Sequence, residues 1–127
     1  MAKISSFREL MVWQKSMAVA SMAYAFTRGW PAEHRFGIAS QIQRSAVSVP
    51  SNIAEGYERR SRAEYLRFLA ISAGSLAELE TQIRLATRVG LGNATSEALI
   101  ARIHEVGRMI RGIERSLKAP RTSKPIK

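Results

Sequence analysis

Residues 41–64 read QIQRSAVSVPSNIAEGYERRSRAE and carry two opposed rows of side chains. At about 100° per residue, positions that recur every three or four residues lie on one face of a helix. One row is apolar and holds Ile38, Ile42, Ala46, Val49, Ile53 and Tyr57. The opposite row is polar and holds Gln41, Arg44, Ser48, Asn52, Glu55 and Arg59. The pattern predicts a helix with one face on a core and recognition on the other.

Pro50 lies in the middle of this pattern. Proline has no backbone N–H and its ring crowds the carbonyl of Ala46, so a continuous helix must bend there. The alternative is two helices, with Pro50 in the first turn of the second. Because both rows continue across the proline, we favour one helix kinked at Pro50. A purely structural role for Ser48, Ser51 and Asn52 is hydrogen bonding to the loosened backbone.

Apolar periodicity and capping signals predict three more helices. The first is expected from Phe7, capped by Ser5 or Ser6, to about Gly29, and the helix with Pro50 from His34 to about Tyr57, where Gly56 is a natural stop. The third begins at a capping box, Ser61–Glu64, and ends at Gly90, and the fourth is capped by Thr95 or Ser96 and closed by Pro120. We therefore predict an all-α, antiparallel up-and-down four-helix bundle over residues 1–119, followed by a disordered basic tail over 120–127.

The predicted first helix is apolar on two faces. One face holds Leu10, Trp13, Met17, Ala20 and Tyr24, and the other holds Val12, Val19, Ala23 and Phe26. Such a helix is either central in a bundle or buries one face against another subunit. Within the third helix, Gly74 interrupts good helix formers, and we expect another backbone to approach it closely.

Composition narrows the class of protein. The chain has 127 residues, enough for one domain, and no cysteine, which excludes disulfides and thiolate metal sites. No segment reads as a signal peptide or as a membrane span of about 20 apolar residues, so we expect a cytoplasmic protein. The formal net charge is +10, which makes nucleic acid or another polyanion a candidate partner.

The basic residues form two groups. Arg59, Arg60 and Arg62 lie between the second and third helices, and four more follow a 3-4-3 spacing along the fourth helix: Arg108, Arg111, Arg115 and Lys118. Arginine forks bind phosphate in a bidentate manner, and several such contacts give strong, salt-sensitive affinity. The competing interpretation is that these charges complement the helix dipole and keep the surface solvated. With few aromatic residues nearby, the pattern does not support reading of a base sequence.

Catalytic or metal-binding patterns are absent. His34 and His104 lie in separate elements, outside any HExxH or ExxH motif, and Glu78 and Glu80 have no such partner pattern. We expect no enzyme activity, no metal and no cofactor. A second hypothesis is a protein–protein scaffold whose interaction face comprises Arg44, Ser48, Asn52 and Glu55, although a solvated surface explains those residues as well.

Three stretches resemble a known family. They are VWQKS at 12–16, SQIQRSAVSVPSNIAEGYERRS at 40–61 and EYLRFLAISAGSLAELETQI at 64–83. They are similar to the bacterial four-helix-bundle proteins encoded in intervening sequences of 23S rRNA genes. The sequence departs from the family pattern at Gln43, where relatives usually carry arginine, and at Trp30-Pro31, where Phe-Pro is commoner.

The resemblance implies an up-and-down four-helix bundle and a ring-shaped homo-oligomer, since related structures are pentamers. A distant relative, the accessory protein of diversity-generating retroelements, is also a basic pentamer and works with a reverse transcriptase and nucleic acid. We therefore expect a non-enzymatic oligomer that binds RNA or DNA through backbone phosphates, with a protein partner as the alternative.

Overall fold

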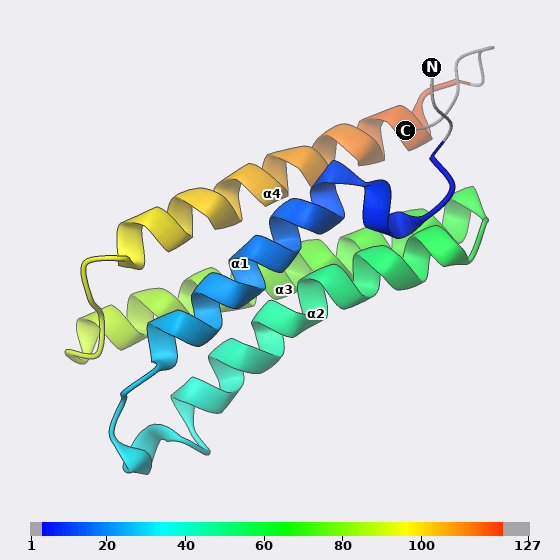
Figure 1. The fold of residues 1–127 in the computed structure, drawn as a ribbon. Helices are drawn as coiled ribbons and strands as arrows, with labels where there is room; N and C mark the ends of the chain where they lie inside the picture. The colour runs from blue at the N-terminus through cyan, green and yellow to red at the C-terminus, as the bar shows by residue number, and fades with distance from the viewer. Residues whose placement is uncertain (1–3, 121–127) are drawn as a thin grey trace.

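The computed structural model describes residues 4–120, which form α-helices and short 3-10 helices and contain no strand. The elements in chain order are η1 (Phe7–Glu9), α1 (Met11–Thr27), η2 (Ala32–His34), α2 (Ile38–Glu58), α3 (Arg62–Arg88) and α4 (Ser96–Lys118). The four long helices lie side by side, as in a bundle (Figure 1). The all-α fold with four helices is confirmed, while the predicted tail, apart from Pro120, lies outside the described residues.

Two predicted boundaries in the first half are wrong. Ser6 caps only η1, accepting a hydrogen bond from the Arg8 N–H at 3.2 Å, and extended backbone at Leu10 (φ −73°, ψ 124°) delays α1 to Met11. The helix expected from His34 begins at Ile38, because Gly37 before it is not helical (φ −109°, ψ −118°). Local backbone breaks of this kind are invisible to apolar periodicity.

Gly56 does not end α2, which continues to Glu58. The left-handed residue at this turn is Arg60, with φ of 58°. Gly56 instead allows α3 to approach, because a Cβ there would lie 2.6 Å from the Phe68 Cβ. The close backbone expected at Gly74 is not found within the described chain, since a Cβ at that position meets nothing there within 4 Å.

The capping and stop signals in the sequence predict the ends of α3 and α4 only in part. The Ser61 hydroxyl accepts the Glu64 N–H at 3.3 Å, which confirms the first half of the capping box. Gly90 follows α3 with φ of 87°, as predicted. Thr95 precedes α4, but its side chain makes no capping hydrogen bond. The Asn93 side chain organises that turn instead and accepts the Thr95 N–H at 2.8 Å.

Pro50 lies inside one uninterrupted helix, so the two-helix alternative is wrong. Two side chains donate to carbonyls close to it. The Asn52 Nδ2 donates to the Ser48 carbonyl at 2.8 Å, and the buried Ser72 hydroxyl of α3 donates to the Val49 carbonyl at 2.9 Å. Ser51, expected to help here, is exposed.

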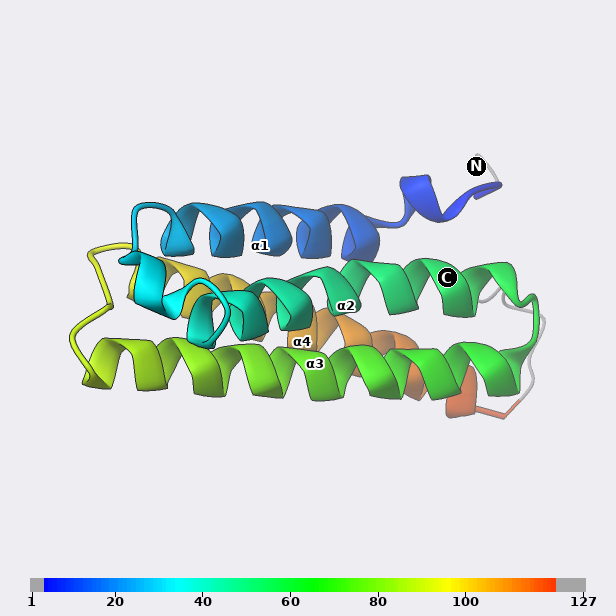
Figure 2. The same ribbon diagram turned by 90° about the horizontal axis from the view of Figure 1, so that it is seen from below.

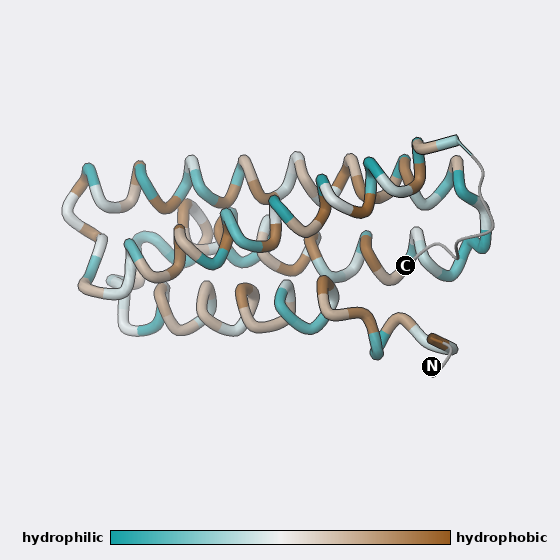
Figure 3. The backbone as a smooth tube through the Cα atoms, turned by 90° about the horizontal axis from the view of Figure 1, so that it is seen from above, coloured by the Kyte–Doolittle hydropathy of each residue, from teal (hydrophilic) through white to brown (hydrophobic). Residues whose placement is uncertain are grey.

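The core lies among all four helices, and α1 contributes one face to it. The buried face of α1 holds Val12, Val19, Ala23 and Phe26. On its other face Met17 and Tyr24 remain 42% and 45% exposed, so α1 is not a central helix. Figure 3 shows the resulting alternation of hydrophobic and hydrophilic positions along the helices. None of the helices in residues 4–120 is long and apolar enough to cross a membrane.

The chain connections bring the first basic group and the last turns of α4, where the second basic group ends, to the same end of the molecule. Figures 1 and 2 both show η1, the α2–α3 connection and the last turns of α4 at the same end. The α1–α2 and α3–α4 connections lie at the other end. Two groups that are about 50 residues apart in sequence are thereby brought to one region.

Candidate nucleic-acid interface

The clearest positive surface lies on α4. It consists of four exposed residues, here called the α4 basic row: Arg108, Arg111, Arg115 and Lys118. At 1.5 Å per residue the row extends for about 15 Å along the helix axis. Among the residues that the structure describes, no side chain forms an ion pair or hydrogen bond with any of the four. Their charges are therefore free to meet an external anion.

Two guanidinium groups of this row lie over glycines of α4, where an added Cβ would make only ordinary van der Waals contact. A Cβ at Gly107 would lie 3.4 Å from the Arg111 Nη1, and one at Gly112 would lie 3.8 Å from the Arg115 Nη2. Helical side chains lean toward the N-terminus, so each fork reaches back over the preceding turn. The two guanidinium groups consequently lie close against the helix and are held near its surface.

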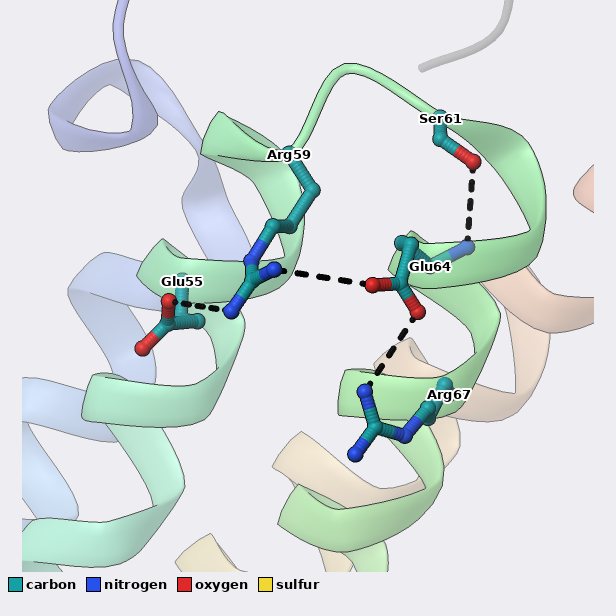
Figure 4. Close-up of polar contacts among 5 residues, drawn as sticks. All are labelled: Glu55, Arg59, Ser61, Glu64 and Arg67. Carbon is teal, nitrogen blue, oxygen red and sulfur yellow. Dashed lines mark hydrogen bonds and ion pairs between the residues drawn. The ribbon is translucent and has the colours of Figure 1, made fainter.

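Arg59 is occupied within the chain. It forms ion pairs with Glu55 at 3.1 Å and with Glu64 at 3.6 Å, and its guanidinium lies 5.1 Å from the centre of the Phe68 ring. Glu64 also pairs with Arg67 at 3.4 Å (Figure 4). The negative charges of the two carboxylates therefore offset the positive charges of the two guanidinium groups. A phosphate would have to compete with these carboxylates, which makes Arg59 a weaker ligand than the sequence suggested.

Arg62 and Arg60 differ from each other although they are neighbours. The half-buried Arg62 donates from Nη1 to the Leu117 carbonyl at 2.6 Å, at the end of α4 where carbonyls lack helical partners. Its Nε is buried with no hydrogen-bond partner in the described part of the chain. Arg60 is exposed. The two predicted basic groups thus meet through a helix-capping contact.

A groove runs between α3 and α4 beside the α4 basic row. Its volume is about 340 Å³, and its wall includes Ala73, Ala77 and Gly107, with Arg108 and Arg111 also lining it. At one end lie Glu80 of α3 and His104 of α4.

Glu80 holds two partners from two helices. Its carboxylate accepts from the Arg84 Nε at 2.9 Å and from the His104 Nε2 at 2.8 Å. The hydrogen bond from Arg84, with the smaller contribution from His104, lowers the pKa of the Glu80 carboxyl against the opposing effect of burial. Sequence reasoning missed this pair because the two residues are 24 positions apart and belong to no spaced motif.

The predicted interaction face on α2 is not one continuous surface. The half-buried Ser48 shares a 2.7 Å hydrogen bond with Ser75 of α3, and the Asn52 amide donates to the Ser48 hydroxyl at 3.0 Å. Glu55 pairs with Arg59, and Arg44 is exposed. The expectation that this row faces away from the core is therefore wrong for Ser48 and Asn52, because both are half-buried and Ser48 bonds to α3.

An apolar groove of about 620 Å³ lies between α1 and α2 and includes Met17, Tyr24 and Val47. A smaller hollow of about 360 Å³ adjoins it, sharing Tyr24 and Val47 and adding Arg44 and Ser48. Within residues 4–120 no cluster of three or more histidine or acidic side chains is arranged to hold a metal ion.

Comparisons with known proteins agree with the fold. The model of the family described as 23S rRNA-intervening sequence protein matches residues 8–112. The chain is similar to the crystal structure of a protein of unknown function from the S23 ribosomal protein family of Bacteroides thetaiotaomicron VPI-5482. The two share 25% identity and a TM-score of 0.74, over 83% of this chain and 99% of the other. A search of curated proteins found no match.

Proposed function

This chain belongs to the 23S rRNA-intervening sequence protein family, and we propose that it is a non-enzymatic, cytoplasmic protein that binds RNA or DNA through backbone phosphates. The observation that carries the proposal is the α4 basic row, whose four cations are exposed and free of carboxylate partners in the described chain. Binding through phosphates alone is sequence-nonspecific.

The strength of such binding depends on counterion release. Each phosphate neutralised by an arginine or lysine releases condensed cations, so affinity falls steeply as salt rises. Four contacts from one row give modest affinity by themselves. Assembly into an oligomer would multiply them into avidity.

Two charge-matched variants test the proposal. The row variant carries Arg108→Gln, Arg111→Gln and Arg115→Gln. The control variant carries Arg28→Gln, Arg35→Gln and Arg88→Gln, at exposed arginines outside the row. Each lowers the formal net charge from +10 to +7.

Fluorescence anisotropy with labelled 20-nucleotide RNA and DNA across a salt series measures the outcome. We expect the row variant to bind at least tenfold more weakly at low salt. The slope of log K against the logarithm of the salt concentration should be smaller in magnitude by two to three. The control variant should lose only the part of the affinity that depends on the total net charge of the protein. Equal affinities and slopes for the two variants would refute binding through the row.

A second candidate is a scaffold that binds a protein partner on the α1–α2 side. The observation that favours it is the apolar groove with exposed Met17, Tyr24 and Val47, adjoined by Arg44. This candidate predicts that Arg44→Ala abolishes capture of a partner while polyanion binding persists. It also predicts that the row variant captures the partner normally, which pull-down followed by mass spectrometry would check.

We further propose that the chain assembles into a homopentamer, in which another copy of the chain, and not a different protein, covers this side of α1. Support comes from the apolar side of α1 that the chain itself leaves uncovered, with Met17 and Tyr24 each more than 40% exposed. Light scattering coupled to gel filtration should then give a mass near 70 kDa, five times the 14.1 kDa of one chain. A monomer mass that persists at high concentration would contradict the proposal.

We also propose an antiparallel up-and-down course with a kink in α2 at Pro50. The contact between Arg62, at the start of α3, and Leu117, near the end of α4, supports the course. The missing N–H of Pro50 supports the kink. Spin labels at the exposed Gln41 and Glu58 test the kink, because Pro50→Ala should straighten α2 and lengthen their separation.

A further inference from the structure

Resting on the proposed function, we infer that the α3–α4 groove receives an unpaired base of single-stranded nucleic acid while the phosphates of the strand lie on the α4 basic row. The groove and the row are adjacent, because Arg108 and Arg111 line the groove and also belong to the row. A strand held by these two arginines therefore passes along the groove's edge.

The groove has the size and wall that a flat ring requires. Its volume of about 340 Å³ falls within the range of small-ligand pockets, roughly 300–1,000 Å³. Small side chains at Ala73 and Ala77, and the absence of one at Gly107, leave space in the groove, and the His104 imidazole is the one aromatic ring among its lining residues. Bases also stack on guanidinium planes, which Arg108 and Arg111 provide at the rim.

The charges in the groove do not repel a polyanion. The one carboxylate lining it, Glu80, is bound by Arg84 and His104, so its negative charge is compensated in place. The His104 ring is about half exposed and engages Glu80 through Nε2, and its Nδ1 makes no hydrogen bond to the described residues. That nitrogen is the polar group that a base edge would meet at this end of the groove.

A duplex cannot use the same groove. Its bases are stacked and paired, and extruding one costs a few kcal/mol before any contact forms. A duplex therefore presents its phosphates to the row and leaves the groove empty. A single strand adjusts its backbone to the straight row and turns a base inward at little cost. The groove thus distinguishes single strands from duplexes, while the row binds both.

Filling the groove separates this inference from the proposed function. Ala77→Leu adds a bulky side chain to the groove and leaves all charges unchanged, and Ala98→Leu, at an exposed site in the first turn of α4, is the matched control. Anisotropy with a labelled 12-nucleotide thymidine strand and a 12-base-pair duplex should show about tenfold weaker strand binding for Ala77→Leu. Duplex binding should change less than twofold, and Ala98→Leu should change neither.

An unchanged strand affinity in Ala77→Leu, or an equal loss for strand and duplex, would overturn the inference. In both cases a loss of affinity in the row variant would leave the proposed function standing. The unaltered protein supplies a second test that does not depend on the folding of a variant. A 2-aminopurine within the strand should brighten on binding as it leaves its neighbours in the stack, and constant fluorescence at saturation would also overturn the inference.

Discussion

Gly56 and Gly74 lie in adjacent helices but in opposite surroundings. A Cβ at Gly56 would overlap the Phe68 Cβ at 2.6 Å, whereas one at Gly74 would reach nothing within 4 Å. We expect Gly56→Ala to lower the free energy of unfolding by about 1–3 kcal/mol, because backbone must move apart. Gly74→Ala should raise it by up to about 1 kcal/mol through helix propensity. Urea titration measures both, and a gain at Gly56 would contradict the packing described.

Tyr65 is a buried phenol whose hydroxyl has no hydrogen-bond partner in the described chain. Burial, with a smaller contribution from the nearby Tyr57, raises the pKa of Tyr65 to about 12. Since the folded value exceeds the ordinary one near 10, the neutral phenol's contribution to stability is full below pH 10 and is lost as pH rises through 12.

Tyr65→Phe should therefore change how stability depends on alkaline pH. From pH 9 to 12 we expect the unaltered chain to lose roughly 2 kcal/mol more than the variant, at about 1.4 kcal/mol per pKa unit. Below pH 9 the variant should be at least as stable, because it removes an unpaired buried hydroxyl. Urea unfolding at each pH gives the difference, and parallel losses in the two proteins would rule out this role for Tyr65.

At the level of helices, apolar periodicity is sufficient to predict four of them and the core face of α2. It does not locate backbone breaks, so it places the starts of α1 and α2 four residues early, at Phe7 and His34. Apolar periodicity also predicts that the whole polar row of α2 faces solvent, although Ser48 and Asn52 are half-buried. Ser48 binds Ser75 because the serines and Gly56 let α3 pack closely, and a period of 3.6 residues carries no information about that neighbour.

The candidate site is predictable only as far as it lies on one helix. The 3-4-3 spacing of the α4 basic row is enough to place its residues on one helical face. In contrast, the partners of Arg59 and the Glu80–His104 pair require the packing of α3 against α2 and α4. One sequence contains no spacing rule for contacts between separate helices, so the groove beside the row cannot be foreseen from it.

Arg62 joins two helices by capping the end of α4 through its 2.6 Å bond to the Leu117 carbonyl. We expect Arg62→Gln to lower the free energy of unfolding by about 1.5–3 kcal/mol, because a charged hydrogen bond at a helix C-terminus is lost. The exposed neighbour gives a control, since Arg60→Gln removes the same charge and should cost less than about 0.5 kcal/mol. Equal effects in thermal unfolding would show that charge, and not the cap, stabilises this end.

For the whole molecule, the net charge of +10 gives salt two opposite effects. Salt screens repulsion among the positive charges, so the Tm of the free protein should rise between 20 and 200 mM NaCl. The same salt weakens binding to phosphates, so the rise in Tm caused by an added oligonucleotide should shrink. At 20 mM NaCl, a ligand concentration 100 times the Kd stabilises the folded state by about 2.7 kcal/mol, which is several °C.

The row and control variants separate these two effects, because both carry a formal net charge of +7. Their free proteins should respond to salt in the same way, since repulsion depends on total charge. Only the row variant should lose most of the rise in Tm given by the oligonucleotide, because binding depends on where the arginines lie. Differential scanning fluorimetry with and without the strand measures all four conditions. If the control variant lost the oligonucleotide-induced rise in Tm equally, binding would depend on the total positive charge and α4 would hold no localised interface.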